Sequence, residues 1–457
     1  MNSNKTDERC GEKEMAKTES LKKGLTQELL TKGIGHKEVK DTEIGKIPKE
    51  WDFVRLEHLV KKDKFAIVDG PFGTQLHSNE YVKLGVPLIR EDNINKNGSF
   101  NPNNLVYITE EKWEELKRSA VFPGDILLAK TGATIGKVCL FPDKFKKGLI
   151  SSNCAKISTD PSKACNQYIF YFLLSNFGYS QILALANGSA RSTINLTSIS
   201  EIKIAIPKNI KEQQKIADIL SDLDEKIELN NRMNKTLEDI AQAIFKRWFI
   251  DFEFPNENGE PYKSSGGEMV ESELGMIPRK FKIGFLSEIA AVKSGRRPSE
   301  KNETKTEVFK YPLVGASSIN GYVKEPLFYE PVIVIGRVGT HGVVQRFSSH
   351  SFPSDNTLVI ISKFKEFSFQ ILKRINYAEL NVGSTQPLIT QTSISNIKII
   401  IPPEQILTDF EDITKNLYKL TDLNNNLNES ISKIRDLLLP KLMTGKIRVP
   451  LEEQNVQ

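Results

Sequence analysis

The chain carries most of its sequence pattern twice, and this internal repeat constrains the fold more than any other feature. The stretch TSISEIKIAIP (197–207) returns as TSISNIKIIIP (392–402), and other blocks return around glycines and Ile-Pro pairs. In chain order, the matching blocks are 42–59 with 272–289, 86–95 with 311–320, 129–138 with 336–344, and 188–207 with 383–402. We therefore expect two similar domains in tandem.

The two copies differ in the segments between the matching blocks. The offset between the copies falls from 230 residues, at Thr42 and Ser272, to 195 residues, at Gly188 and Gly383. The first copy alone carries EEKWEELKRS (110–119), which is predicted to form a surface helix. A repeated scaffold with variable loops is typical of a binding domain that was duplicated and then diverged in specificity.

The Gly-rich stretch KTGATIGKV (130–138) raises the question of nucleotide binding. A phosphate-binding loop needs G-x-x-x-x-G-K followed by Ser or Thr. Here Gly132 and Gly136 are one residue too close, and Val138 stands where the hydroxyl is required. The second copy, GRVGTHGVV (336–344), keeps glycines but loses the lysine. We expect a tight β-turn in which glycine supplies a positive φ.

A long helical pattern follows each copy, at 212–249 and at 404–443. Residues of one helical face recur every seven positions in both patterns, as in a coiled-coil seam. The predicted seam residues are Ile216, Leu223, Asn230, Leu237 and Ile244 in the first helix, and Phe410, Leu417, Asn424, Ile431 and Leu438 in the second. A second seam row is predicted at Ile219, Met233 and Ile240, and at Ile413, Leu427 and Ile434. Such a helix measures roughly 55–60 Å.

We expect the two helices to pair with each other in antiparallel orientation. Asn230 and Asn424 occupy matching seam positions, where a polar residue fixes register, and an antiparallel pair can bring them close together. Trp248 and Phe249 are predicted to pack at the helix end. The predicted fold class is α+β: two similar α/β domains in tandem, separated by two long antiparallel coiled-coil helices and related by a pseudo-two-fold axis.

Composition limits the remaining classes of function. No run of 18 apolar residues and no apolar signal segment is present, which predicts a cytoplasmic protein without a membrane span. The 4 cysteines and 5 histidines lack metal-ligand spacing, so we expect reduced thiols and no metal site. The net charge of +5 permits nucleic-acid binding but does not demand it.

Four stretches together resemble the specificity subunit of type I restriction–modification enzymes. They are TEIGKIPKEW (42–51), KTGATIGKV (130–138), TSISEIKIAIP with the QQKIADIL helix start that follows it (197–220), and LLLPKLMTGKIRV (437–449). The resemblance covers nearly the whole chain beyond residue 20. It rests on the repeat together with the helix start, since a lone G-x-x-x-G-K is not specific.

The resemblance implies that each domain recognises one half of a bipartite, asymmetric site in double-stranded DNA. The helices would act as the spacer and as the dock for two modification subunits, which methylate adenine with S-adenosylmethionine. Restriction subunits would add ATP- and Mg²⁺-dependent translocation and cleavage. The chain itself would then be non-catalytic and bind no cofactor. In agreement, the sequence carries no N-P-P-[FYW] methylation motif and no true phosphate-binding loop.

The repeat and the resemblance together predict the domain boundaries. The expected segments are a disordered leader (1–20), an N-terminal helical arm (21–41), a first target-recognition domain (42–207), a central long helix (208–255), a linker (256–270), a second target-recognition domain (271–402), a C-terminal long helix (403–447) and a tail (448–457).

Candidate DNA contacts were chosen in the Gly-rich turns and in the loops at the ends of the repeated blocks. Arg, Lys, Gln, Ser and Thr there can contact phosphates or base edges. In the first domain they are Gln75, Arg90, Lys130, Thr131, Lys137, Ser189 and Arg191. In the second they are Arg296, Arg297, Ser317, Arg337, Thr340, His341, Ser384 and Gln386. The turn of the second copy is degenerate, and His341 can equally be a local turn residue.

Two other functions remain open from the sequence. One is a coiled-coil scaffold whose domains bind peptides. The other is an NTPase built on KTGATIGKV (130–138), against which the degenerate second copy counts.

Overall fold

The computed structural model describes residues 36, 38–72, 75–188, 192–338, 342–380 and 388–450. The chain divides into two compact units: residues 1–227 with 429–457, and residues 228–428. Each division point falls inside a long helix. Therefore α6 (Ile210–Phe245) and α9 (Glu404–Met443) each contribute one half to both units.

The first unit contains two four-stranded sheets. One has the order β4-β11-β8-β9 and is antiparallel throughout: β4 (Ile67–Asp69), β11 (Cys154–Ile157), β8 (Ile126–Ala129) and β9 (Val138–Leu140). The other has the order β6-β5-β10-β7: β6 (Val106–Ile108), β5 (Val86–Ile89), β10 (Gly148–Ile150) and β7 (Ala120–Val121).

Two-stranded pairs and short helices complete the first unit. The pairs are β1 (Val39–Thr42) with β2 (Gly45–Pro48), and β3 (Asp52–Arg55) with β12 (Lys203–Ile206). The helices are α2 (Glu110–Glu115), α3 (Asn166–Leu174), α4 (Asn176–Leu185) and α5 (Leu196–Ser200). The predicted surface helix at 110–119 is confirmed by α2, whose Trp113 is buried and donates to the Gly148 carbonyl.

The second unit repeats this architecture with shorter connections. Its main sheet has the order β16-β22-β19-β20: β16 (Ala290–Ser294), β22 (Thr357–Ser362), β19 (Val332–Gly336) and β20 (Val344–Phe347). The other strands are β13 (Met269–Ser272) with β14 (Gly275–Pro278), β15 (Lys282–Phe285) with β23 (Lys398–Ile401), and β18 (Ile319–Val323), β17 (Tyr311–Val314) and β21 (Phe352–Pro353). Its helices are α7 (Lys365–Leu372) and α8 (Gln391–Ser395).

The predicted duplication is confirmed at the level of strand register. In the first unit Leu128 faces Ala155, and in the second Ile335 faces Leu358, at the same places in the two main sheets. The repeated Thr-Ser-Ile-Ser segment forms α5 and α8, whose first turns are capped by Asn195 and by the hydroxyl of the preceding Thr390. Side-chain oxygens at this position satisfy backbone N–H groups that lack helical partners.

The long helices form part of the hydrophobic core of each unit. In the first unit Ile216 and Leu442 are fully buried with Trp51 and Tyr168. In the second unit Phe410 of α9 packs with Phe245, and with Trp248 and Phe249 in the π-helical turn Lys246–Ile250. The predicted packing of Trp248 and Phe249 against the partner helix is thus confirmed.

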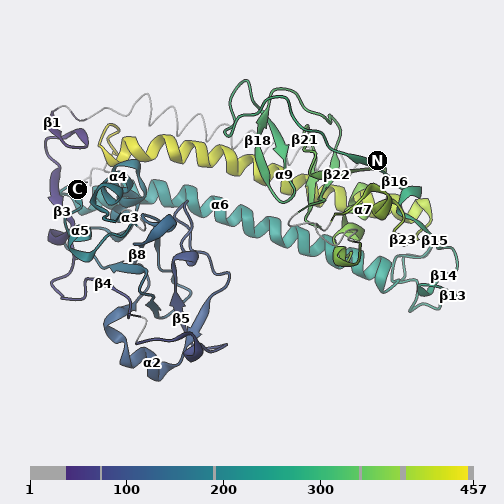
Figure 1. Cartoon of the computed structure of the whole chain (residues 1–457), viewed down its shortest axis with the longest axis horizontal. Helices are drawn as coiled ribbons and strands as arrows, with labels where there is room; N and C mark the ends of the chain where they lie inside the picture. The colour runs from purple at the N-terminus through teal and green to yellow at the C-terminus, as the bar shows by residue number, and fades with distance from the viewer. Residues whose placement is uncertain are drawn as a thin grey trace, which may run out of the picture. The chain divides into compact units, whose positions relative to one another are not determined.

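The two long helices are antiparallel within each unit (Figure 1). In the second unit Asn230 donates to Asn428 (2.7 Å) and Asn234 to Asn425 (2.9 Å), so residue numbers rise on one helix as they fall on the other. In the first unit Arg435 donates to Asp224 at 2.8 Å. All ten residues predicted for the first seam row lie at buried or half-buried positions. The pseudo-two-fold relation between the domains stays a prediction.

The second predicted seam row is wrong at three of its six positions. Met233, Ile240 and Ile413 are 46%, 42% and 42% exposed, whereas Ile219 and Ile434 pack against the core of the first unit and Leu427 is half-buried. The buried or half-buried residues of a second row also include Leu220, Asn234 and Ala241 on α6, and Leu407, Thr414 and Asn428 on α9. Several of these side chains are small or polar, so hydrophobicity alone does not indicate them.

The two seam asparagines do not bond to each other. Asn230 bonds to Asn428, and Asn424 donates to Asn234 at 2.9 Å. Each asparagine therefore meets a residue one helical turn away from the predicted partner. Each observed hydrogen bond joins an asparagine of the first seam row to one of the second row, Asn428 or Asn234.

The ends of the chain lie largely outside the described residues. The predicted leader (1–20) and most of the predicted helical arm (21–41) are outside them, and the arm's last residues belong to strand β1. In the predicted tail (448–457), Val449 is buried in the core of the first unit. Among the described residues, no helix combines the length and apolar character needed to cross a bilayer.

Candidate nucleic-acid interface

Several predicted contact residues of the first unit gather at one end of its main sheet. Lys130 follows β8 and donates its backbone N–H to the Asn153 carbonyl (2.9 Å), just before β11. Its own carbonyl accepts from Ile194 (3.0 Å). Thr131 forms an isolated bridge with Thr193. The Gly-rich turn and the segment after Gly188 therefore adjoin at this end of the sheet.

The Gly-rich turn uses its own backbone donors internally. Gly132 and Gly136 have φ values of 63° and 82°, the positive values expected from the sequence. The N–H groups of Gly132, Ile135, Gly136 and Lys137 donate to the carbonyls of Ser192, Gly132, Ala129 and Thr134. A phosphate loop needs these groups free to cradle an anion, so the geometry contradicts the NTPase alternative.

The side chain of Lys130 takes part in an internal ion pair. Its Nζ lies 2.8 Å from Asp69 Oδ2, and the two side chains are 11% and 15% exposed. Beside it, the Thr131 hydroxyl is buried without a hydrogen-bond partner among the described residues. Lys137, at the far end of the turn, is half-buried.

Arg90 and Gln75 also make local contacts. Arg90 follows β5 and donates from Nη2 to the Asn104 carbonyl (2.9 Å), while its Nε is buried without a partner among the described residues. Gln75 accepts at Oε1 from the Phe72 backbone N–H (3.3 Å), and Phe72 is 62% exposed. The role of both residues in DNA contact stays a prediction.

The second unit builds the same end of the sheet with different side chains. Arg337 follows β19 and donates its backbone N–H to the Asn356 carbonyl (3.1 Å), and its carbonyl accepts from Ile389 (3.1 Å). These are the contacts that Lys130 makes, so the predicted equivalence of Lys130 and Arg337 is confirmed. Arg296 and Arg297 are exposed after β16.

The remaining predicted contacts are only partly placed. Ser317 is exposed in the loop between β17 and β18. The residues that lie outside the described residues are Ser189, Arg191, Thr340, His341, Ser384 and Gln386. Sequence reasoning missed Asp69 and Phe72. Both lie in DGPFG (69–73), which aligns with SGRRP (294–298) and could have been found by extending the repeat.

The cysteines of this region are not suited to nucleophilic chemistry. Cys139 and Cys154 are free and fully buried in the first unit. Burial raises the pKa of the Cys154 thiol to about 12, and it raises the pKa of Cys139 as well. Both thiols are therefore protonated near neutral pH, whereas the thiolate is the reactive form.

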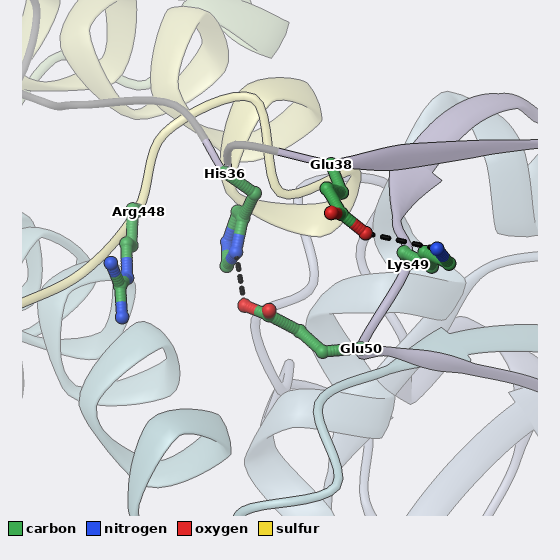
Figure 2. Close-up of a pocket in the computed structure, with 5 residues that line it drawn as sticks. All are labelled: His36, Glu38, Lys49, Glu50 and Arg448. Carbon is green, nitrogen blue, oxygen red and sulfur yellow. Dashed lines mark hydrogen bonds and ion pairs between the residues drawn. The ribbon is translucent and has the colours of Figure 1, made fainter.

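A separate polar pocket lies in the first unit, where the segment before β1 meets the segment after α9 (Figure 2). It has a volume of about 380 Å³ and is lined by His36, Glu38, Lys49, Glu50 and Arg448. His36 Nδ1 lies 2.5 Å from Glu50, and Lys49 Nζ lies 2.9 Å from Glu38. Both contacts lie within the pocket, and none of its residues was predicted as a DNA contact.

The fold and the two sheet ends define a protein with two copies of one binding scaffold, each carrying its own set of polar side chains. The chain matches the family model described as "Type I restriction modification DNA specificity domain" over residues 48–266 and 278–433, and it belongs to that family. The resemblance seen in the sequence is thereby confirmed.

Individual relatives agree with this assignment. The chain is 28% identical over 440 residues to the specificity subunit of the type I restriction enzyme MjaIX of Methanocaldococcus jannaschii, covering 90% of this chain and 97% of the relative. It is 26% identical over 404 residues to the HindI specificity subunit of Haemophilus influenzae, covering 72% and 88%. The crystal structure of the type I S subunit from M. genitalium matches with a TM-score of 0.56 at 20% identity, covering 86% and 96%, which shows the shared fold.

Proposed function

We propose that this chain is the DNA-recognition subunit of a type I restriction–modification complex and has no catalytic activity of its own. Each unit contacts one half of a bipartite, asymmetric site in double-stranded DNA. Two modification subunits dock on α6 and α9, and they bind the S-adenosylmethionine. Restriction subunits bind the ATP and Mg²⁺, and the complex works in the cytoplasm.

The observation that carries this proposal is the pair of equivalent sheet ends. Lys130 and Arg337 hold the same backbone contacts, yet Arg296 and Arg297 stand where the first copy has Pro71 and Phe72. Different side chains on one scaffold suit the recognition of two different base sequences. Family membership supplies the class of ligand.

The test is methylation by the assembled complex. The full chain, co-purified with its modification subunits, is incubated with genomic DNA and S-adenosylmethionine, and N6-methyladenine is mapped. We expect a single bipartite motif with two dissimilar halves, and no transfer by the chain alone. Methylation without sequence preference, or methyl transfer by the isolated chain, would contradict the proposal.

The same complex should bind the methylated motif with a steep dependence on salt. Neutralisation of phosphates by Lys and Arg releases counterions, so the logarithm of the affinity falls linearly with the logarithm of the salt concentration. A scaffold whose domains bind peptides would show no such slope on duplex DNA.

A further inference from the structure

Lys130 and Arg337 occupy equivalent positions but have different electrostatic surroundings. In the first unit Asp69 and Leu128 both face Ala155, and Lys130 lies two residues beyond Leu128. In the second unit Ser294 and Ile335 both face Leu358, and Arg337 lies two residues beyond Ile335. The register therefore places Ser294 where the first unit has Asp69.

Asp69 neutralises Lys130 within the first unit. The Nζ–Oδ2 distance of 2.8 Å and the low exposure of both side chains describe a largely buried ion pair. Arg118 Nη2 lies 3.9 Å from the other carboxylate oxygen of Asp69. The carboxylate neutralises the charge of a lysine held in this way. Lys130 would have to break the ion pair before its ammonium group could reach a DNA phosphate.

Arg337 has no such carboxylate. The Ser294 hydroxyl accepts from Gln391 Nε2 (2.8 Å) and carries no charge. Among the described residues, Arg337 has no ion-pair partner, and its Nε is buried without a hydrogen bond. A buried donor without a hydrogen-bond partner destabilises a folded protein, and in a native structure it calls for an explanation such as a functional role. The backbone of Arg337 makes the same two hydrogen bonds as the backbone of Lys130.

The backbone around Arg337 limits where its side chain can lie. A Cβ atom on Gly336, the residue before it, would lie 2.1 Å from the Ala316 carbonyl oxygen. A Cβ on Gly295 would lie 2.1 Å from the Ser354 carbonyl oxygen. Both strand ends thus lie in close backbone contact with neighbouring segments, and Arg296 and Arg297 are exposed just after β16, which β22 separates from β19.

We infer that Arg337 is the cation through which the second unit contacts DNA, whereas Lys130 is a structural residue of the first unit. This inference rests on the function proposed above. The guanidinium presents its donors either to phosphate oxygens or to the O6 and N7 acceptors of guanine. The first unit must then contact DNA through other groups, and the candidates are Arg90, which follows β5 in the second sheet, and the exposed Phe72.

The experiment compares three variants of the full chain in complex with its modification subunits. Arg337→Gln removes the unpaired cation. Ser294→Asp introduces the carboxylate that the first unit has, and leaves the arginine in place. The matched control is the double variant Asp69→Asn/Lys130→Gln, which removes both charges of the internal pair and keeps a hydrogen bond between the two side chains.

Affinity is measured by fluorescence anisotropy on a duplex carrying the mapped motif, with thermal melting as the check on folding. We expect Arg337→Gln and Ser294→Asp each to weaken binding by roughly 10- to 100-fold, the range of one good charged contact. The double control should lose less than about 3-fold. If Arg337 contacts a base, Arg337→Gln should change the methylation motif at one position of one half-site. If it contacts a phosphate, the variant should weaken binding equally for all sequences and reduce the slope of the logarithm of affinity against the logarithm of salt concentration.

Two results would overturn the inference. One is unchanged affinity for both Arg337→Gln and Ser294→Asp in folded complexes. The other is a loss in the double control as large as the loss in Arg337→Gln. If Arg337→Gln fails to fold, Ser294→Asp decides alone, because it retains the arginine. Failure of the wild-type complex to bind any duplex would instead refute the proposed function itself.

Discussion

Glu411 of α9 links the stability of the second unit to pH. Its carboxylate accepts backbone N–H groups from Glu366 (3.2 Å) and Phe367 (2.8 Å) in the first turn of α7. Burial raises the pKa of Glu411 to about 7, and the nearby Glu366 charge adds to this, against the lowering effect of the two N–H groups and of Lys365. The contact holds α7 against the long helix.

The sign and size of the effect follow from this pKa. Between pH 4.5, the ordinary value, and about 7 the folded carboxyl holds a proton that the unfolded chain has released. Stability of the second unit therefore falls as pH rises through this window. At about 1.4 kcal/mol for each pH unit, the free energy of unfolding is about 3 kcal/mol lower above pH 7 than below pH 4.5 from this group alone.

The perturbation is Glu411→Gln, which abolishes the ionisation and keeps one acceptor oxygen. Loss of one hydrogen bond costs about 1 kcal/mol at every pH. We expect the variant to be about 2 kcal/mol more stable than wild type at pH 8 and slightly less stable at pH 4.5. Urea unfolding at the two pH values, followed by hydrogen exchange of the α7 amides, measures the difference.

The matched control is Glu404→Gln, on the exposed first turn of the same helix, where Glu404 pairs with Lys363 at the surface. It should show no gain at pH 8, because the Lys363 contact lowers the pKa of Glu404. Equal pH profiles for wild type and Glu411→Gln would refute the reasoning, since they would mean that Glu411 ionises in the folded unit at no cost.

Two further predictions concern the helix pair. Phe410→Ala removes a fully buried ring whose centroid lies 5.1 Å from that of Phe249. The free energy of unfolding of the second unit, measured in urea, should fall by about 3–5 kcal/mol, and a fall of less than about 1 kcal/mol would contradict the packing. The double variant Asn230→Leu/Asn428→Leu removes the part-buried Asn230–Asn428 hydrogen bond, the bond from Asn428 to Asn231, and an Asn230 oxygen that is buried without a partner among the described residues. We expect its free energy of unfolding to rise by about 1–2 kcal/mol, while cysteine cross-links across the pair report mixed registers. A lower free energy of unfolding would show that the asparagines stabilise the pair.

The repeat made much of the fold predictable because it compares the chain with itself. Features that both copies retain are those that the backbone requires, such as the glycines of the turn and a polar N-cap side chain, Asn195 before α5 and Thr390 before α8. Gly136 has a positive φ and packs against Tyr179, where a Cβ would lie 2.6 Å from the ring. Such positions keep their identity while the loops between them change.

Contacts between distant strands were not predictable in the same way. Asp69 and Lys130 are separated by 61 residues, and only the strand order β4-β11-β8 brings them together. Lys130 was therefore predicted as a DNA contact without any indication of its ion-pair partner Asp69. The second seam row was only partly predicted for a related reason: Thr414 and Ala241 are fully buried, and neither is conspicuous by hydrophobicity.

The two copies show how recognition can change at little cost to folding. Gly70 and Gly295 are equivalent, and a Cβ on either would lie within 2.2 Å of a backbone atom of Ser151 or Ser354, in the segments that precede β11 and β22. These close approaches fix the ends of the strands. The side chains that follow, Phe72 in one copy and Arg297 in the other, are exposed and are not part of the hydrophobic core. Exposed substitutions usually change stability by less than about 0.5 kcal/mol, whereas one base contact changes affinity by about 1–3 kcal/mol. Substitutions at these positions can therefore change ligand specificity while the backbone at the end of the sheet stays the same.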